Sequence, residues 1–231
     1  LYGKNEDSDL GRLLRRMVKI PEIGRIRLSS LEANEVTEGV LELMKHSSKI
    51  CRHLHLPLQS GSDRILRVMN RPYTASDYEE KVKRIKSILP DISISTDVMV
   101  GFPGEEEEDF RASYEMAERL GFSRVHVFPF SAHEKTPAGQ MRQELPGRVI
   151  RSRAKELREL GEKLENGFVN SFRGKELEVV VEGVSSSRFW GRSQYYFQVP
   201  FTEKDIVSYR EQEATSSPEE LVGRILSVQF Q

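Results

Sequence analysis

The chain has 231 residues, with 35 Lys and Arg against 36 Asp and Glu, so its net charge of -1 provides no basic field that would by itself indicate nucleic acid. One cysteine, Cys51, excludes an internal disulfide and favours a reducing compartment, which predicts a cytoplasmic protein. The sequence shows no signal peptide and no apolar run long enough to span a membrane.

Strands and helices are predicted to alternate over the first 130 residues, as in a parallel α/β fold. In chain order they are helix 9–19, strand 25–29, helix 34–45, strand 53–58, helix 63–69, helix 74–89, strand 93–100, helix 106–120 and strand 124–130. A parallel α/β domain normally begins with a strand, whereas this chain begins with Leu1 and a helix. We therefore expect a piece of a longer protein whose earlier strands are missing, which would leave an exposed sheet edge beside residues 25–29.

Polar residues and glycines follow the predicted strands, where α/β folds bind their ligands. They are Ser29, Ser30, Glu32, Gln59, Ser60, Gly101 and Ser131. This pattern predicts a barrel-like or doubly wound parallel sheet with a site at one face.

The stretch 94–110 is the clearest of these units, since a β-branched strand leads to Gly101-Phe102-Pro103-Gly104 and then to a helix. The five acids at 105–109 would repel a phosphate, so the loop suits a neutral or cationic group such as an adenine ring or a sulfonium. The alternative is an ordinary strand-to-helix turn with a solvated acidic helix start.

A long charged helix is predicted from residue 147 to 172, and the pattern then changes to short alternating strands. The strands are predicted at 177–181, 188–192, 194–199 and 221–230, with loops at 184–187 and 210–220. We predict two domains, 1–172 and 173–231, the second a small all-β barrel near the lower size limit for a core of its own. In that domain cations and aromatics are mixed, which suits RNA binding but also a small core with exposed arginines. The RNA-binding candidates are Arg188, Trp190, Arg192 and Tyr195.

Two further patterns are weighed for chemistry. Cys51, His53 and His55 alternate, so on a strand they would share one face and could bind zinc, but no fourth ligand is spaced to join them and we predict no metal site. Asp97 lies within an apolar strand, on the face opposite Val98, and so need not line the site.

Five ordered motifs resemble the radical S-adenosylmethionine methylthiotransferases, and residues 173–231 resemble the TRAM module that closes those proteins. The motifs are IRLSSLE at 26–32, CRHLHLPLQSGSD at 51–63, MNRPYT at 69–74, TDVMVGFPGE at 96–105, and VFPFS at 127–131 with TPA at 136–138.

The resemblance implies a partial (β/α) TIM-like barrel, a [4Fe-4S] cluster that cleaves S-adenosylmethionine to a 5′-deoxyadenosyl radical, and a second cluster that supplies sulfur. The radical would abstract hydrogen from C2 of an adenine beside a tRNA anticodon. Motif 59–63 and the strand 126–130 are most similar to the branch that acts on threonylcarbamoyladenosine. The isopentenyladenosine branch and the ribosomal-protein branch are the alternatives.

The chain departs from the family in its cysteines. The Cys-x3-Cys-x2-Cys motif is absent, and so is the N-terminal domain with three more cysteines, so neither cluster has its ligands in this chain and the chain alone is expected to be inactive. The resemblance implies contacts with S-adenosylmethionine or substrate from Ser30, Glu32, Gln59, Ser60, Val100, Gly101, Phe102, Phe128, Pro129 and Ser131.

Two other functions stay open at this point. The chain could be an RNA-binding scaffold with no chemistry of its own. It could also be an unrelated barrel enzyme that uses Glu32, Asp97 and histidine residues in acid–base work, although Asp97 lies too far up its strand for that role.

Overall fold

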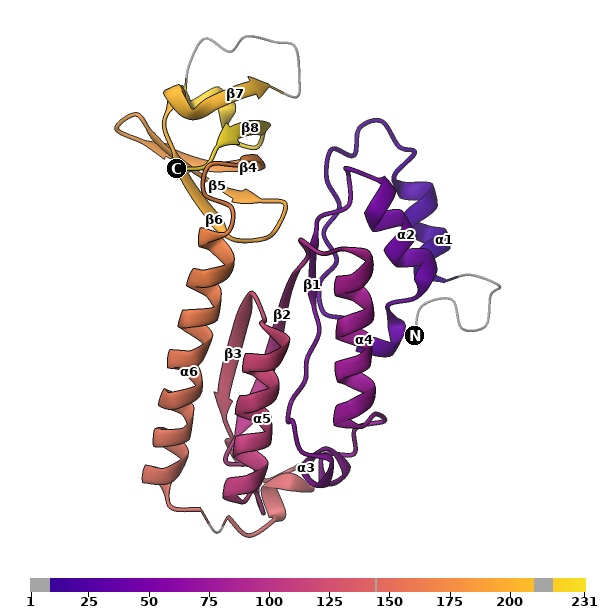
Figure 1. Ribbon diagram of the computed structural model, residues 1–231, viewed down its shortest axis with the longest axis vertical. Coiled ribbons are helices and arrows are strands. Elements are labelled where there is room, and N and C mark those ends of the chain that lie inside the picture. Colours follow the sequence, from indigo (N-terminus) through magenta and orange to yellow (C-terminus); the bar gives the residue numbers. More distant parts are fainter. Residues whose placement is uncertain (1–8, 144, 210–217) are drawn as a thin grey trace. The chain divides into compact units, whose positions relative to one another are not determined.

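The computed structural model describes residues 9–143, 145–209 and 218–231 of the chain (Figure 1). The chain divides into two compact units. The β unit comprises residues 1–28, 42–53 and 168–231, and the α/β unit comprises residues 29–41 and 54–167. The predicted division after residue 172 stays a prediction.

Helices and strands alternate through the first two thirds of the chain, and strands dominate the rest. In chain order they are α1 (Leu10–Met17), η1 (Ala33–Glu35), α2 (Glu38–His46), β1 (His53–His55), α3 (Asp63–Val68), α4 (Ala75–Ile88), β2 (Ser93–Val100), α5 (Glu107–Leu120), β3 (Arg124–Pro129), η2 (Ala138–Gln140), α6 (Gly147–Asn170), β4 (Glu176–Ser185), β5 (Arg188–Ser193), β6 (Gln198–Phe201), η3 (Glu203–Asp205), β7 (Ile206–Tyr209), η4 (Pro218–Leu221) and β8 (Ile225–Gln229).

The sheet that organises the α/β unit has the strand order β1-β2-β3. Strands β2 and β3 run parallel, in a register that pairs Asp97 with His126. Successive side chains of a strand point to opposite faces. On β2 the face that carries Val98 and Val100 is fully buried, whereas Asp97 on the other face is half-buried.

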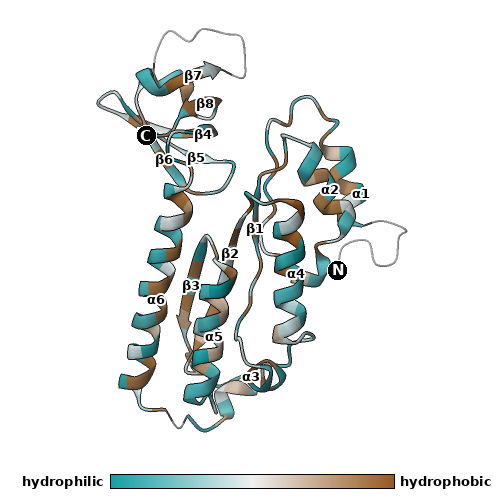
Figure 2. Ribbon diagram, in the orientation of Figure 1, coloured by the Kyte–Doolittle hydropathy of each residue, from teal (hydrophilic) through white to brown (hydrophobic). Residues whose placement is uncertain are grey.

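Helices α4 and α5 lie beside the sheet and supply the core of the α/β unit (Figure 1). The hydroxyl of the buried Tyr78 on α4 donates to the Leu56 carbonyl oxygen over 2.6 Å, so this helix is tied to the sheet as well as packed on it. Helices α4, α5 and α6 alternate hydrophobic and hydrophilic residues along their length (Figure 2), the pattern of helices with one buried side.

The loop between β1 and α3 is held against α5. Ser62 caps α3, and its hydroxyl donates to the Asp109 carboxylate over 2.5 Å. The backbone amide of Gly61 donates to the Ser113 hydroxyl over 2.8 Å. A Cβ atom on Gly61 would lie 2.5 Å from the carbonyl oxygen of Ala112, so this close approach requires glycine.

Two predicted strands are shorter than the sequence pattern indicates. The predicted strand 25–29 is not a strand: Ile26 forms an isolated parallel bridge with Ile50, and Ser30 forms another with His55. The predicted strand 53–58 ends at His55, and the backbone returns to the sheet at Gln59, which bridges to Val98. Alternating apolar residues thus extended the prediction into segments whose backbone pairs with the sheet only at single bridges.

The β unit is built on an antiparallel sheet of order β6-β5-β4-β8-β7. Its strands alternate buried and exposed residues, and its core gathers the inward side chains, which include Phe172, Val179, Phe189 and Val228. Strands β6 and β7 are the two ends of this order, so closure into the predicted TRAM-like barrel is not confirmed.

The turns of the β unit are partly at other residues than predicted. Ser186 and Ser187 both have positive φ and join β4 to β5 in a tight hairpin, as the predicted loop 184–187 requires. The predicted strand 194–199 is instead a turn followed by β6, because Tyr196 takes a left-handed φ of 75°. The predicted loop 210–220 lies mostly outside the described residues.

Among the described residues, the structure contains no helix with both the length and the apolar character needed to cross a bilayer.

Glu79 on α4 makes a pH-dependent link to α5. Its carboxylate accepts from Arg119 at 2.8 Å and pairs with Lys83 at 2.8 Å, and these bonds, that to Arg119 first, lower the pKa of Glu79 from 4.5 to about 2. The pKa of Glu79 is lower in the folded chain than in the unfolded chain. The stabilisation is therefore complete at pH values above the unfolded-state pKa and is lost as the pH falls toward the folded-state pKa.

We therefore expect Glu79→Gln to lower the free energy of unfolding at neutral pH, and this difference from wild type to shrink between pH 4.5 and about 2. Urea unfolding across that range measures it, and Arg119→Met should reproduce the effect. A difference that stays constant with pH would show that the link is not the cause.

Gly61→Ala should destabilise the α/β unit by about 1–3 kcal/mol, because the added methyl group meets backbone atoms of α5 that cannot turn aside. Gly167→Ala on α6 is the matched control, since nothing lies within 4 Å of its Cβ position. That control should be neutral or stabilising by up to about 1 kcal/mol, as alanine favours helix. Equal effects of the two substitutions in thermal unfolding would refute the steric argument.

Candidate functional site

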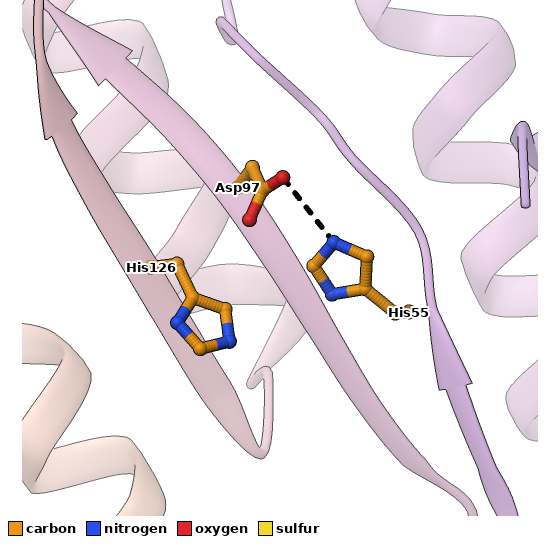
Figure 3. Close-up of side chains that lie close together, drawn as sticks. All are labelled: His55, Asp97 and His126. Carbon is orange, nitrogen blue, oxygen red and sulfur yellow. Dashed lines mark hydrogen bonds and ion pairs between the residues drawn. The ribbon is translucent and has the colours of Figure 1, made fainter. Parts of the chain in front are cut away.

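Three polar side chains lie in a row on the half-exposed face of the β1-β2-β3 sheet, one from each strand (Figure 3). They are His55, Asp97 and His126, and one ligand atom of each lies within 4.8 Å of the others. His55 Nε2 is 3.2 Å from Asp97 Oδ2, and the two imidazole centroids are 5.7 Å apart. Burial lowers the pKa of His126, with a smaller contribution from Arg124.

This row corrects the prediction for Asp97. The side chain does lie on the face opposite Val98, as predicted, but that is the face on which the two histidines gather. To predict that His126 lies beside Asp97, one must know which residues of their two strands pair, and a single sequence does not contain that information. The sequence does contain one local signal: His126 alternates with Val125 and Val127, which places the histidine on the opposite face of its strand from the two valines.

The three residues weighed as zinc ligands, Cys51, His53 and His55, do not form one group of ligand atoms. Within the described part of the chain, the one group of three possible ligand atoms contains His55 but neither Cys51 nor His53. Cys51 is buried, and burial raises the pKa of its thiol. The ring of His53 lies 4.6 Å from the ring of Tyr196 instead.

Gln59 and Ser60 are placed differently from one another. The backbone of Gln59 has a left-handed φ of 67° and bonds to both Asp97 and Met99 of β2, which leaves its half-buried side chain available. Ser60 is 1% exposed, and its hydroxyl lies 3.4 Å from that of Ser113 on α5. The side chain of Ser60 therefore positions the loop, and its expected contact with a ligand stays a prediction.

Both backbone polar groups of Gly101, its N–H and its carbonyl oxygen, are hydrogen-bonded to side chains. The Gly101 amide donates to Glu105 Oε1 over 3.0 Å, and its carbonyl oxygen accepts from Gln143 Nε2 over 2.7 Å. Gly101 has a left-handed φ of 74°, and the buried Arg153 donates to the same Glu105 oxygen over 2.6 Å. Burial raises the pKa of Glu105, while the Gly101 amide and Arg153 favour its charged form.

Four of the five acids that follow this loop, Glu105, Glu106, Glu107 and Asp109, are paired with arginines. Arg153 also binds Glu107 over 2.9 Å, and Arg64 binds Asp109, whose pKa is lowered by hydrogen bonds from Ser62 and Glu106 against the effect of burial. The prediction that five acids give this loop a repulsive field for phosphate is therefore too strong. These ion pairs join residues that are far apart in the sequence, so no local sequence pattern could have predicted them.

The remaining loop side chains divide between core and surface. Val100 and Phe102 are buried, and Phe102 packs edge-to-face on Phe130 with 5.3 Å between ring centroids. Their side chains cannot line an open pocket, so only their backbone could meet a ligand. Phe128 is 51% exposed, and Pro129 and Ser131 are exposed as well, as a ligand contact requires. Phe128 lies on the same face of β3 as His126, Pro129 is the last residue of that strand, and Ser131 follows it.

Ser30 and Glu32 lie beside β1. Ser30 is exposed and bridges to His55, which places it next to the polar row. Glu32 pairs with Arg71 over 3.2 Å through one oxygen, while its other oxygen is buried without a hydrogen-bond partner in the described residues. A buried carboxylate oxygen of this kind is a place for a ligand donor.

The candidates in the β unit also divide. Trp190 is 36% exposed and rests on Gly183, and Arg188 is exposed. Arg192 pairs with Glu182 over 3.1 Å. Only 9% of Tyr195 is exposed and it packs in the core, and its expected contact with RNA stays a prediction.

The neighbouring Tyr196 was not singled out by the sequence pattern. It is 42% exposed, and its ring centroid lies 4.3 Å from the guanidinium carbon of Arg27 and 5.1 Å from that of Arg192. Its left-handed backbone turns the side chain outward where strand alternation would not have predicted it.

The buried pair of Arg153 and Glu105 yields a stability prediction. Arg153→Met should destabilise the chain by about 3–5 kcal/mol, because it leaves a carboxylate buried without its partner. The loss should be largest at high pH, where that carboxyl must stay charged, and should shrink as the pH falls. Chemical unfolding at several pH values measures it.

The double variant Glu105→Gln with Arg153→Met is the control for this prediction. It removes the buried charge and keeps an acceptor for the Gly101 amide, so it should recover part of the lost stability. A double variant as unstable as Arg153→Met at every pH would contradict the account.

Comparison with known proteins shows what the chain is similar to. The sequence model of the radical SAM superfamily matches residues 2–117. A tRNA-2-methylthio-N(6)-dimethylallyladenosine synthase of Acetivibrio thermocellus is 39% identical over 84% of this chain and 41% of its own length. The threonylcarbamoyladenosine tRNA methylthiotransferase MtaB of Thermotoga maritima is 36% identical over 95% of this chain and 51% of its own length.

A solved structure agrees at the level of the fold. Coproporphyrinogen III oxidase of Escherichia coli, a radical SAM enzyme, has a TM-score of 0.50 with 16% identity and covers 71% of this chain and 38% of its own. The chain spans about half the length of the curated relatives it matches.

Proposed function

Because the chain belongs to the radical SAM superfamily, we propose that it is part of an enzyme that adds a methylthio group to an adenosine of tRNA. The observation that carries this proposal is the similarity, over most of the chain, to two kinds of tRNA methylthiotransferase. The proposal concerns the whole protein, since the relatives are about twice as long.

We further propose threonylcarbamoyladenosine as the substrate, with isopentenyladenosine as the alternative. Relatives of both kinds match at similar identity, so the choice rests on residues of this chain. The half-exposed sheet face carries His55, Asp97 and His126, and a polar face suits the carboxylate and hydroxyl of a threonylcarbamoyl group better than an apolar dimethylallyl group.

The iron–sulfur clusters that the family implies do not fit the residues present. A [4Fe-4S] cluster is held by several thiolates, whereas the chain has one cysteine and that one is buried. Cluster ligands would have to come from outside this chain, and the chain alone would be inactive. This is also the observation that favours the second candidate function, an RNA-binding scaffold.

For S-adenosylmethionine, the residues that stay candidates are those with free or exposed groups. Glu32 presents a buried carboxylate oxygen without a partner, Gln59 presents its amide, and Phe128 presents an exposed ring. An adenine edge can bind amide and backbone groups while its face stacks on an aromatic ring. Ser60 and Phe102 would act indirectly, by holding their loops in place.

For the RNA, Trp190 and Arg188 offer an exposed ring and a cation on β5, and Tyr196 adds a second ring beside the strand. Such pairs of stacking rings and cations bind single-stranded loops, and an anticodon loop is one. Binding of this kind weakens with salt because cations displace counterions from the phosphates.

The test compares this chain with the full product of its gene. The full product, reconstituted anaerobically with iron and sulfide, should show an iron–sulfur absorbance, bind S-adenosylmethionine and methylthiolate an anticodon stem-loop carrying threonylcarbamoyladenosine. The chain alone should bind that RNA without turnover. Trp190→Ala should weaken RNA binding about tenfold, the loss of one stacked base, while Val207→Ala, an exposed apolar residue of β7, should not.

A full product that takes up no cluster would overturn the enzyme and leave the RNA-binding scaffold. Turnover on isopentenyladenosine RNA alone would overturn the substrate and keep the reaction. If Trp190→Ala and Val207→Ala bind RNA equally, the RNA surface lies elsewhere.

A further inference from the structure

His55, Asp97 and His126 have the residue types of a metal site, and their ligand atoms are close enough together to form one. Two imidazoles and a carboxylate are a common ligand set for zinc and for other divalent transition metals. The three ligand atoms lie within 4.8 Å of one another, and His55 Nε2 and Asp97 Oδ2, 3.2 Å apart, already have the spacing of neighbouring ligands on one ion.

The backbone holds these side chains in place. Asp97 lies inside the eight-residue strand β2, and its Cα pairs in register with that of His126 on β3. Ligands on adjacent strands of one sheet are held more precisely than ligands on loops. Small side-chain rotations are enough to bring His126 onto an ion already bound by the other two.

A second contact orients His55. Its Nδ1 lies 2.9 Å from the hydroxyl oxygen of Ser95, which is 3% exposed and lies two residues before Asp97 on β2. When Nδ1–H donates to that oxygen, the lone pair of Nε2 is directed at the Asp97 carboxylate. Histidine ligands of metals are typically fixed in this way, by a hydrogen bond from the other ring nitrogen.

In the other tautomer of His55, Nε2–H donates to the Asp97 carboxylate and Nδ1 accepts from the Ser95 hydroxyl, so without a metal ion the 3.2 Å contact is an ordinary hydrogen bond. Among the described residues the ion pair of Asp97 is made with His55, and no lysine or arginine pairs with it. That hydrogen bond uses His55 and Asp97 alone, whereas a metal ion uses all three side chains that the sheet gathers here.

The site is also accessible. The side chains of His55 and Asp97 are 19% and 24% exposed, so an ion can enter and a coordination position stays open toward the uncovered face of the sheet. Three protein ligands with a fourth position for water are typical of zinc sites that act on substrates, whereas structural sites are closed by four.

We propose that His55, Asp97 and His126 bind one divalent transition metal ion, with Zn²⁺ as the reference ion and water in the open position. This site is separate from any iron–sulfur cluster, since it contains no thiolate. It depends only on the β1-β2-β3 sheet, so it stands or fails independently of the proposed methylthio transfer. The proposed preference for threonylcarbamoyladenosine uses the same three side chains, and a metal ion there would have to be part of that recognition.

The test uses the chain itself, freed of metal with a chelator and then titrated with Co²⁺ and Zn²⁺. Co²⁺ should bind with a stoichiometry of one and show visible d–d bands of a site of four or five ligands, without a thiolate charge-transfer band. Zn²⁺ should displace it, and calorimetry gives the affinity of each ion.

Substitutions identify the ligands. His55→Gln, Asp97→Asn and His126→Gln should each weaken Zn²⁺ binding by more than tenfold, and Ser95→Ala should weaken it about 10–100-fold by releasing the ring of His55. The matched controls are His46→Gln and His133→Gln, two exposed histidines outside the row, which should bind as wild type does.

Three results would overturn the proposal: no binding by the folded wild-type chain, equal binding by ligand and control variants, or a thiolate band that Cys51→Ser removes. Circular dichroism checks the fold of each variant. Should one unfold, Asp97→Glu replaces it as a test, because the longer carboxylate stays a ligand at altered distance and should change the Co²⁺ spectrum. An unchanged spectrum in that variant also counts against the site.

Discussion

The register of β2 between its two neighbouring strands is the constraint on which the rest of the α/β unit depends. It turns Val98 and Val100 toward the core and Asp97 to the opposite face, in line with His126. A slip of one residue would exchange the two faces and place a carboxylate in the core. The apolar core and the polar row are thus two results of one pattern of backbone hydrogen bonds.

Around this sheet, buried ionic and polar contacts hold the loops at the strand ends. Glu105 and Arg153 fix the Gly101 loop, and Ser113 fixes the loop at Gly61. Both loops lie where α/β folds bind ligands, and both use groups that sequence inspection would assign to a ligand. Part of the polar chemistry in these motifs therefore serves the structure, and the exposed or half-buried residues beside them are left for binding.

Much of the fold was predictable because its signals are local. Helical spacing and caps located α4 and α5, and Gly121 ends α5 in the left-handed conformation that its sequence predicts. The site was less predictable, since its geometry is set by pairing between distant segments. The burial of Ser60 and the meeting of His55 with His126 depend on which strand lies beside which, and at what register.

The turn at Tyr195 and Tyr196 gives two adjacent and identical residues opposite surroundings. Tyr195 fills the core beside Phe172, and Tyr196 lies outside it against two arginines. The first position therefore has room only for a large ring, since a smaller side chain would leave a cavity. The second can change without disturbing the core, and what changes is the contact with the two guanidinium groups.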